Sequence, residues 1–393
     1  MGKQLEVADI FRSSGSAYRD AHGRQMPLRH FRVMRAIEIC RTSGLGGHVD
    51  ECDECGSLRI SYNSCRNRHC PKCQCLDKER WLEARKKDLL PTHYFHVVFT
   101  IPEDLRPVTL RNQKVIYNIL FLAVSETLKA LAGNPKHLGA DIGFIALLHT
   151  WTQTLLDHPH IHCIVPGGGL SLDGQRWISS KKDFFIHVKV LSRKFRGKFL
   201  HYLKKSYNNG ELVFPGVINT LESKSAFEKF LSGFYAQEWV VYCKPPFKRP
   251  EDVIDYMGRY THRVAISNDR IVDVQSDEVT FKYRDRADKN TIKYMSLDAS
   301  EFIRRFLLHV LPDGFMKVRH YGLLSNRNRK TKLQQCKALL GAKFQEDDIG
   351  DKESWEDLLL RLTGIDPRIC PTCGKGRLVP KEKIRPKTIR SPP

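Results

Sequence analysis

Three histidines occupy alternate positions in the stretch HPHIHCIVPGGG, which runs from His158 to Gly169. A β-strand has a side-chain period of two, so His158, His160 and His162 would point to one face of a sheet. Neutral imidazoles that share a face are a common basis for a metal site. The alternative is a partly exposed strand whose histidines bind nothing. The spacing therefore marks a candidate metal site.

Cysteines form a second candidate site, because seven of the 12 fall between Cys40 and Cys75. The pairs Cys52-x2-Cys55 and Cys70-x2-Cys73 have a separation close to that of zinc ribbons. Their four thiolates could complete one tetrahedral zinc site. The segment is rich in Gly, Ser, Asn and Arg and poor in large apolar residues, so a metal is expected to order it.

The other ligand-type residues of this segment indicate a second zinc site. They are Cys40, His48, Cys65 and His69, with Cys75 left out. A cross-braced arrangement would pair the ligands differently, and spacing alone does not choose between the two. Near the C-terminus, Cys370-x2-Cys373 is half a site, which needs partners from elsewhere in the chain or from another chain. Cys163, Cys243 and Cys336 are expected to be isolated core thiols.

Charge favours a polyanionic partner. The 393 residues include 65 Lys and Arg against 44 Asp and Glu, which gives a net charge of +21 and a pI near 9.5. Nucleic acid is the simplest such partner. A membrane surface is the rival, but we find no apolar run of spanning length and no signal-peptide pattern. The remaining alternative is charge that serves solubility alone.

The chain is expected to alternate helices with strands that are joined by tight turns. Asp173-Gly174 is a hairpin signal. The link over residues 156–159 is short enough to make its flanking strands antiparallel neighbours. These features predict an α+β fold, an antiparallel sheet with helices packed on one side. Helices are expected over residues 28–39, 77–90, 108–132, 189–205, 221–233, 250–263 and 299–311, and strands over 93–101, 143–155, 160–166, 238–243, 264–267, 270–274 and 279–285.

Two tyrosines lie four residues apart on the helix expected over 250–263. Tyr256 and Tyr260 would therefore present their phenols on one face of that helix. Such a pair usually belongs to a core. A divalent ion at His160 and His162 changes this interpretation, because it could polarise a phosphodiester that a tyrosine oxygen then attacks.

These motifs together resemble those of known families. HPHIHCIV is similar to the histidine–hydrophobic–histidine motif of HUH endonucleases, and YMGRYTHR to the two-tyrosine helix of rolling-circle transposases. SCRNRHCPKCQ followed by HYFHVVFTIP resembles the zinc-binding head and first strand of insertion sequence 91-like transposases. HVLPDGFMKVRHYGLL, residues 309–324, also resembles a block of that family. The resemblance covers about residues 28–340.

The resemblance implies a Rep-like HUH nuclease domain whose central antiparallel sheet presents His160 and His162 beside the tyrosine helix. It implies cleavage of one DNA strand, a 5′-phosphotyrosine and a free 3′-hydroxyl. The expected domains are residues 1–90 with the zinc-binding region, 91–340 with the nuclease, and 341–393 as a basic C-terminal region. The expected partners are single-stranded or hairpin transposon ends and target DNA, with homo-oligomers allowed. The expected location is the bacterial cytoplasm, at the nucleoid.

HUH nucleases commonly use a third metal ligand, and the expected catalytic ion is Mg²⁺ or Mn²⁺. Gln153, seven residues before His160, is the expected third ligand, with His149, His158 and His262 as rivals. The glycines from Gly167 to Gly169 are expected to leave room for a strand of DNA.

The neighbours of each tyrosine predict an order of action. Tyr260 lies beside Thr261, His262 and Arg263, groups that could lower its pKa or bind phosphate. It is therefore expected to initiate cleavage, with Tyr256 acting in strand transfer. DNA contacts are expected from Arg66, Arg68, Arg259 and Arg263.

Two other functions compete with a strand-transfer enzyme. A zinc-dependent DNA-binding regulator derived from a transposase would use the same zinc head and basic surface without catalysis. It would have no use for paired tyrosines and paired histidines together. A tyrosine recombinase is weaker, because its chemistry needs no His-x-His strand.

Overall fold

The chain forms two compact units in the computed structural model. One comprises residues 82–261 and 311–346, here called the histidine unit; the other comprises residues 1–81, 262–310 and 347–393, here called the cysteine unit. This division differs from the expected linear one, because residues 262–310 and the C-terminal region join the N-terminal region. The structure describes residues 4–73, 75–181, 185–245, 247, 250–261, 265–275, 277–285, 287–342 and 353–387.

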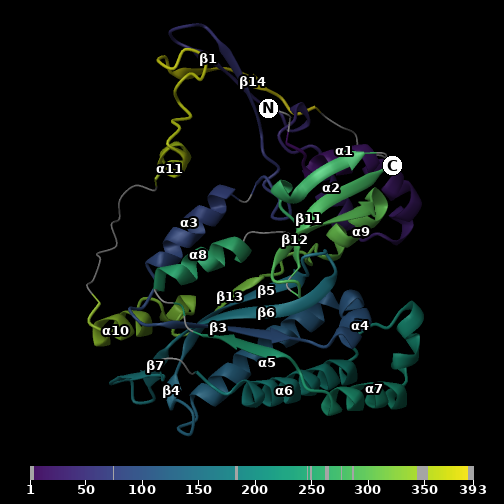
Figure 1. Cartoon of the computed structure of the whole chain (residues 1–393), viewed down its shortest axis with the longest axis vertical. Coiled ribbons are helices and arrows are strands. Elements are labelled where there is room, and N and C mark those ends of the chain that lie inside the picture. The colour runs from purple at the N-terminus through teal and green to yellow at the C-terminus, as the bar shows by residue number, and fades with distance from the viewer. Residues whose placement is uncertain are drawn as a thin grey trace. The chain divides into compact units, whose positions relative to one another are not determined.

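A five-stranded antiparallel sheet organises the histidine unit (Figure 1). Its strand order is β13-β5-β6-β3-β9. The strands are β3 (Tyr94–Thr100), β5 (Gly143–Trp151), β6 (Asp157–Pro166), β9 (Val241–Lys244) and β13 (Val318–Gly322). The predicted hairpin between β5 and β6 is present, and its register sets His149 opposite His160. The expected mixed α+β class with antiparallel sheets is therefore confirmed.

The hydrophobic core of this unit lies on one face of the sheet. Alternate residues of β3 and β6, such as Phe95, Phe99 and Ile161, point into it. Helices α5 (Gln113–Ala132), α6 (Val188–Asn208) and α7 (Lys224–Ala236) cover this face (Figure 1). By length and composition α5 could cross a membrane, but 67% of its apolar window is buried within the protein. We therefore assign α5 to the hydrophobic core. The sequence analysis found no apolar run of spanning length, whereas α5 is such a run.

Helix α8 (Pro250–Thr261) lies on the opposite face of the sheet (Figure 1). Ile145 and Ile164 of the sheet line one small cavity together with Val253, Ile254 and Met257 of α8. Helices therefore cover both faces, whereas the pattern predicted one. The apolar residues at 253, 254 and 257 recur at helical spacing, so α8 has its own face to bury.

The long helix expected over residues 108–132 is divided into α4 (Arg106–Arg111) and α5. Asn112 separates them, and its side chain bonds to Val108 O and to both backbone groups of Val213. A side chain that bonds the backbone in this way competes with helix continuation.

A small sheet of order β4-β7-β8 extends from the histidine unit. It comprises β4 (Ala140–Asp141), β7 (Gly168–Ser171) and β8 (Trp177–Ser179), with the predicted hairpin at Asp173-Gly174. α10 (Lys332–Leu339) contacts this hairpin, since Gln335 Nε2 donates to Gly174 O at 2.8 Å.

The three glycines before this hairpin leave no space for DNA, contrary to expectation. A Cβ on Gly167 would lie 2.2 Å from His93 Nε2, and one on Gly169 would lie 2.3 Å from Asp141 O. Gly168 has a φ of +155° and is equally enclosed, by Ile178 and Trp177. Glycine is needed here because neighbouring chain segments pack directly against its backbone.

Three helices and a three-stranded sheet form one part of the cysteine unit. The helices are α1 (Val7–His22), α2 (Leu28–Glu38) and α9 (Ala299–Leu308), and the sheet is β10 (Ile271–Gln275), β11 (Glu278–Asp285) and β12 (Thr291–Asp298). Phe11 of α1 meets Phe306 of α9 edge-on at 5.2 Å. The sequence interpretation missed β12. It also placed a strand at 264–267, where Ala265–Ser267 form none and Val264 lies outside the described residues.

The other part of the cysteine unit is a sheet that combines strands from the N-terminal and C-terminal regions. β14 (Leu378–Ile384) pairs antiparallel with β1 (Gly47–Cys52), which pairs with β2 (Leu58–Tyr62). α11 (Trp355–Thr363) precedes β14. The boundary between the two units falls within α3 (Cys75–Lys86). The basic C-terminal region thus contributes one strand, β14, to the sheet that contains β1 and β2.

Asp157, at the start of β6, should make the histidine unit less stable as pH rises. It is 2% exposed, and within the described part of the chain neither carboxylate oxygen has a hydrogen-bond partner. Burial raises its pKa from 3.8 to about 7, against the opposing effect of Arg106. Since the folded pKa exceeds the unfolded one, stability is lost as pH rises from about 4 to about 7.

Asp157→Asn should therefore stabilise the protein, and by about 2 kcal/mol more at about pH 8 than at about pH 5.5. Urea unfolding followed by circular dichroism at both pH values measures this difference. Asp104→Asn, which replaces an exposed carboxylate, is the control. An equal effect of Asp157→Asn at the two pH values would contradict the prediction.

Candidate metal and nucleophile site

Three histidines converge on the face of the sheet that α8 covers. The ligand nitrogens of His149, His160 and His162 all lie within 4.8 Å of one another. His149 comes from β5 and the other two from β6, and the ring centroids of His149 and His162 are 4.4 Å apart. The structure thus joins His160 and His162 as expected and brings His149 to them.

The turn between β5 and β6 fixes this convergence. Thr152 N donates to Leu156 O, and Leu156 N donates to the Thr152 hydroxyl at 3.1 Å. Leu155 has a φ of +64°, which is uncommon for leucine and is held by these bonds. The turn therefore sets the register that puts His149 opposite His160.

His160 and His162 each have a bonded Nδ1 that orients the ring. His160 Nδ1 donates to the backbone oxygen of His158 at 2.6 Å. His162 Nδ1 lies 2.7 Å from His96 Nε2. Metal-binding histidines commonly have such a partner on the nitrogen that does not coordinate. This leaves Nε2 as the nitrogen that each ring could offer to a metal ion.

These donors fit a divalent ion. Three imidazoles on one buried face are a common ligand set for transition metals, whereas Mg²⁺ prefers oxygen ligands. Of the other expected third ligands, Gln153 lies in the turn after β5, and His158 contributes its carbonyl to His160. His262 lies outside the described residues. The cluster therefore offers three imidazole nitrogens to a divalent ion.

Tyr256 of α8 lies at the edge of this cluster. Its hydroxyl is 3.3 Å from His96 Nε2, and its ring centroid is 6.5 Å from that of His162. Lys244 Nζ lies 6.0 Å from the centre of the Tyr256 ring. One face of the sheet therefore carries the Tyr256 phenol, the Lys244 ammonium and the three clustered histidines.

Three other residues with expected roles in this site are Arg259, Tyr260 and Arg263. The side chains of Arg259 and Tyr260 lie outside the described part of α8, and Arg263 lies outside the described residues. Their expected roles remain predictions.

His96 is the residue that the sequence interpretation missed. It is 1% exposed in a strand of aromatic and β-branched residues. Burial, followed by the charges of Lys244 and His160, lowers its pKa to about 3, so the ring is neutral. Within the described residues its Nδ1 has no hydrogen-bond partner. An unbonded buried nitrogen costs about 1–3 kcal/mol. The available signal was a histidine in an otherwise apolar strand.

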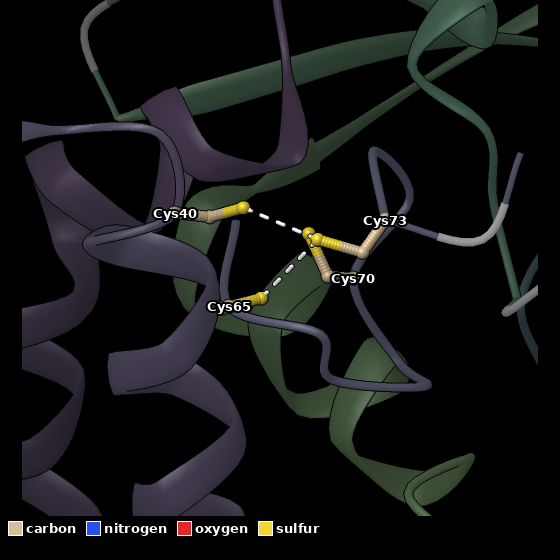
Figure 2. Close-up of side chains that lie close together, drawn as sticks. All are labelled: Cys40, Cys65, Cys70 and Cys73. Atoms are coloured by element: carbon tan, nitrogen blue, oxygen red, sulfur yellow. Dashed lines mark hydrogen bonds between the residues drawn. The ribbon is translucent and has the colours of Figure 1, made fainter. Parts of the chain in front are cut away.

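The cysteine unit contains two groups of four cysteines. In the first, the Cys73 Sγ lies 3.4 Å from Cys40 Sγ and 3.5 Å from Cys65 Sγ, with Cys70 alongside (Figure 2). Sulfurs at the corners of a tetrahedron around zinc are about 3.8 Å apart, given a Zn–S bond of about 2.3 Å. The spacing in this group is close to that value, so the four thiols fit a structural zinc ion.

The second group combines cysteines from the N-terminal and C-terminal regions of the chain. It contains Cys52, Cys55, Cys370 and Cys373. Cys52 Sγ lies 3.7 Å from Cys373 Sγ, and Cys55 Sγ lies 3.8 Å from Cys370 Sγ. The backbone N–H of Cys373, followed by that of Thr372, lowers the pKa of Cys370 to about 6. This favours the thiolate that zinc binds.

The grouping corrects the expected pairing of ligands. Cys52–Cys55 lies with Cys370–Cys373 and not with Cys70–Cys73, so the C-terminal half-site finds its partner within the chain. Neither group includes His48, which faces Asp50 at 3.3 Å, or His69, whose Nδ1 lies 3.2 Å from Asn67 Oδ1. Sequence spacing could not reveal a partner more than 300 residues away.

Arg66 and Arg68 lie in the loop between two ligands of the first group, Cys65 and Cys70. Arg66 is exposed and has a φ of +51°, and Arg68 is half-buried. The DNA contacts expected from these two arginines remain a prediction.

Comparison with known proteins identifies the family. A family model described as "Transposase zinc-binding domain" matches residues 10–101, and one described as "Putative transposase" matches residues 143–332. The chain is 50% identical over 375 residues to "Putative transposase y4qJ" of Sinorhizobium fredii, which covers 95% of this chain and 94% of the relative. No solved structure matches.

A more distant relative agrees. The chain is 25% identical over 338 residues to "Transposase for insertion sequence element IS801" of Pseudomonas savastanoi pv. phaseolicola, which covers 85% of this chain and 79% of the relative. The protein is a DNA-binding transposase with a zinc-binding domain. It belongs to the insertion sequence 91-like family of transposases.

The two cysteine groups predict two zinc ions per chain. The double change Cys370→Ser with Cys373→Ser should leave one, because two thiolates alone hold zinc weakly. Elemental analysis of the purified protein measures the stoichiometry. Cys75→Ser, which replaces an exposed thiol outside both groups, should retain two ions. A protein that keeps two zinc ions after the double change would contradict the grouping.

Proposed function

We propose that this transposase nicks single-stranded DNA through attack of Tyr256 on a phosphodiester, and transfers the strand in rolling-circle transposition. The observation that carries the proposal is the phenol of Tyr256 beside the cluster of His149, His160 and His162 on one sheet face. A DNA-binding regulator without catalysis would have no use for this arrangement.

The histidine cluster would hold a divalent ion. Such an ion, when bound, polarises the scissile phosphodiester and stabilises its developing charge. His160, through its bond to the His158 carbonyl, keeps a fixed ring orientation toward the site. Lys244 adds a positive charge near the phenol, where the DNA phosphate would lie.

The proposed covalent step conserves atoms and charge. The Tyr256 oxygen forms a bond to phosphorus while the bond from phosphorus to the 3′-oxygen breaks. The phenol proton leaves to solvent, and the departing 3′-oxygen takes up a proton to become a hydroxyl. The products are a 5′-phosphotyrosine and a free 3′-hydroxyl. Tyr260 would then serve in strand transfer, by opening a second strand while the first remains attached.

This order reverses the one favoured by the sequence neighbours of Tyr260. The reason is the observed position of Tyr256, whose hydroxyl lies 3.3 Å from a histidine that contacts His162. A nucleophile must start close to the group that it attacks, so proximity to the metal-type cluster favours Tyr256.

The DNA substrate is proposed to be single-stranded or hairpin DNA at the transposon ends. The net charge of +21 supports a polyanionic partner and predicts salt-sensitive binding. The cysteine unit, ordered by zinc, would add contacts from Arg66 and Arg68. The cysteine unit would therefore contribute to DNA binding, while the histidine unit would cleave the DNA strand.

The nucleophile is tested by trapping the covalent adduct. Incubation with labelled single-stranded DNA carrying a transposon end, in Mn²⁺, should yield an adduct that peptide mass spectrometry locates on Tyr256. Tyr256→Phe should reduce initial cleavage at least about 100-fold, because the attacking oxygen is gone. Tyr260→Phe should cleave but fail in strand transfer.

Two outcomes would contradict this assignment. An adduct on Tyr260 alone restores the order suggested by the sequence, and cleavage without any adduct points to metal-activated water. DNA binding measured at low salt should be nearly equal for wild type and both phenylalanine variants, which controls for loss of folding.

The third metal ligand is tested with a matched pair of variants. His149→Ala should weaken Mn²⁺ binding about 10-fold or more, whereas Gln153→Ala should have little effect, because three imidazoles already converge without it. Titration of each protein with Mn²⁺, monitored by electron paramagnetic resonance, measures both. Activity should also require less Mn²⁺ than Mg²⁺. A larger loss with Gln153→Ala would restore the expected glutamine ligand.

A further inference from the structure

His96 is an exception within a buried apolar strand. Its neighbours on β3 include Phe95, Val97 and Phe99, all fully buried in the core. His96 points to the opposite face, where its Nε2 meets two polar groups, and its Nδ1 has no hydrogen-bond partner among the described residues. The buried Nδ1 without a partner lowers the stability of the fold. A histidine at this position despite that cost indicates a role for its other nitrogen, Nε2.

Both groups at Nε2 belong to the proposed site. His96 Nε2 lies 2.7 Å from Nδ1 of His162 and 3.3 Å from the hydroxyl of Tyr256. The His96 and His162 rings are nearly parallel, with 3° between their planes. Since all three rings come from different elements, β3, β6 and α8, their meeting is a property of the fold.

We propose that His96 is a positioning residue that ties the nucleophile Tyr256 to the metal ligand His162. This inference rests on the proposed function. When Nε2 of His162 coordinates a metal, its Nδ1 carries the hydrogen and donates it to His96 Nε2. The Tyr256 hydroxyl, at the longer distance of 3.3 Å, shares this acceptor as the weaker arm of a bifurcated hydrogen bond, so one nitrogen contacts both the metal ligand and the phenol.

The proposal distinguishes His96 from a residue that only fills space. A space-filling role is preserved by any side chain of similar volume, whereas a positioning role needs an acceptor at Nε2. His96→Phe keeps the ring and removes the acceptor. His96→Gln supplies an amide oxygen that can accept both hydrogen bonds. The two variants therefore separate the roles.

The experiment uses the full-length, zinc-loaded protein and two readouts. The first is Mn²⁺ affinity without DNA, measured by electron paramagnetic resonance. The second is single-turnover cleavage of single-stranded DNA at saturating Mn²⁺, as a function of DNA concentration. His93→Gln is the control, because His93 bonds Ser180 at 3.0 Å and belongs to neither partner pair.

His96→Phe should weaken Mn²⁺ binding about 10-fold and lower the maximal cleavage rate about 10- to 100-fold. The DNA concentration for half-maximal rate should not change, because the DNA contacts are intact. His96→Gln should recover most of both losses, and His93→Gln should resemble wild type.

Wild-type Mn²⁺ affinity in His96→Phe would overturn the proposal, as would a glutamine variant no better than phenylalanine. A wild-type protein that forms no DNA adduct would instead refute the proposed function. In that case the comparison of Mn²⁺ affinities, which needs no cleavage, still decides whether His96 positions His162.

Discussion

The convergence of three imidazoles on one sheet face is the constraint on which the histidine unit depends. His149 and His160 lie directly opposite one another on adjacent antiparallel strands, and His162 follows two residues later. A slip of one residue would turn the β6 histidines toward α5 and α6, because side chains alternate between faces. The turn at Thr152–Leu156, with Leu155 at a positive φ, prevents that slip.

The two faces of this sheet have separate tasks. One face is apolar and packs against α5 and α6, so it supplies the stability of the unit. The other presents the histidines and receives α8, whose apolar residues anchor it while Tyr256 reaches the cluster. Rigid packing on the first face is what allows polar groups, including His96 with an unbonded nitrogen, to be held in position on the second.

The cysteine unit follows a different principle. Residues 40–73 have little apolar surface to bury. Clustered thiols that could bind a metal ion would stabilise this segment in place of a hydrophobic core. The second group also closes the chain, because Cys370 and Cys373 meet Cys52 and Cys55 while β14 pairs with β1. A metal there would cross-link segments that are distant in sequence, which constrains the unfolded chain strongly. β14 and the Cys370–Cys373 pair are therefore integral parts of the cysteine unit.

Sequence alone determined what depends on local pattern. Period two marked His160 and His162 on one face, period 3.6 marked α8 with its tyrosines, and the Cys-x2-Cys pairs marked zinc. Tertiary structure decided everything that depends on which segments meet. It joined His149 and His96 to the cluster, paired Cys52–Cys55 with a motif more than 300 residues away, and showed that Gly167–Gly169 serve packing. The physical reason is that spacing reports neighbours along one element, whereas strand register and the partners of a strand or knuckle are set by long-range packing that leaves no trace in local periodicity.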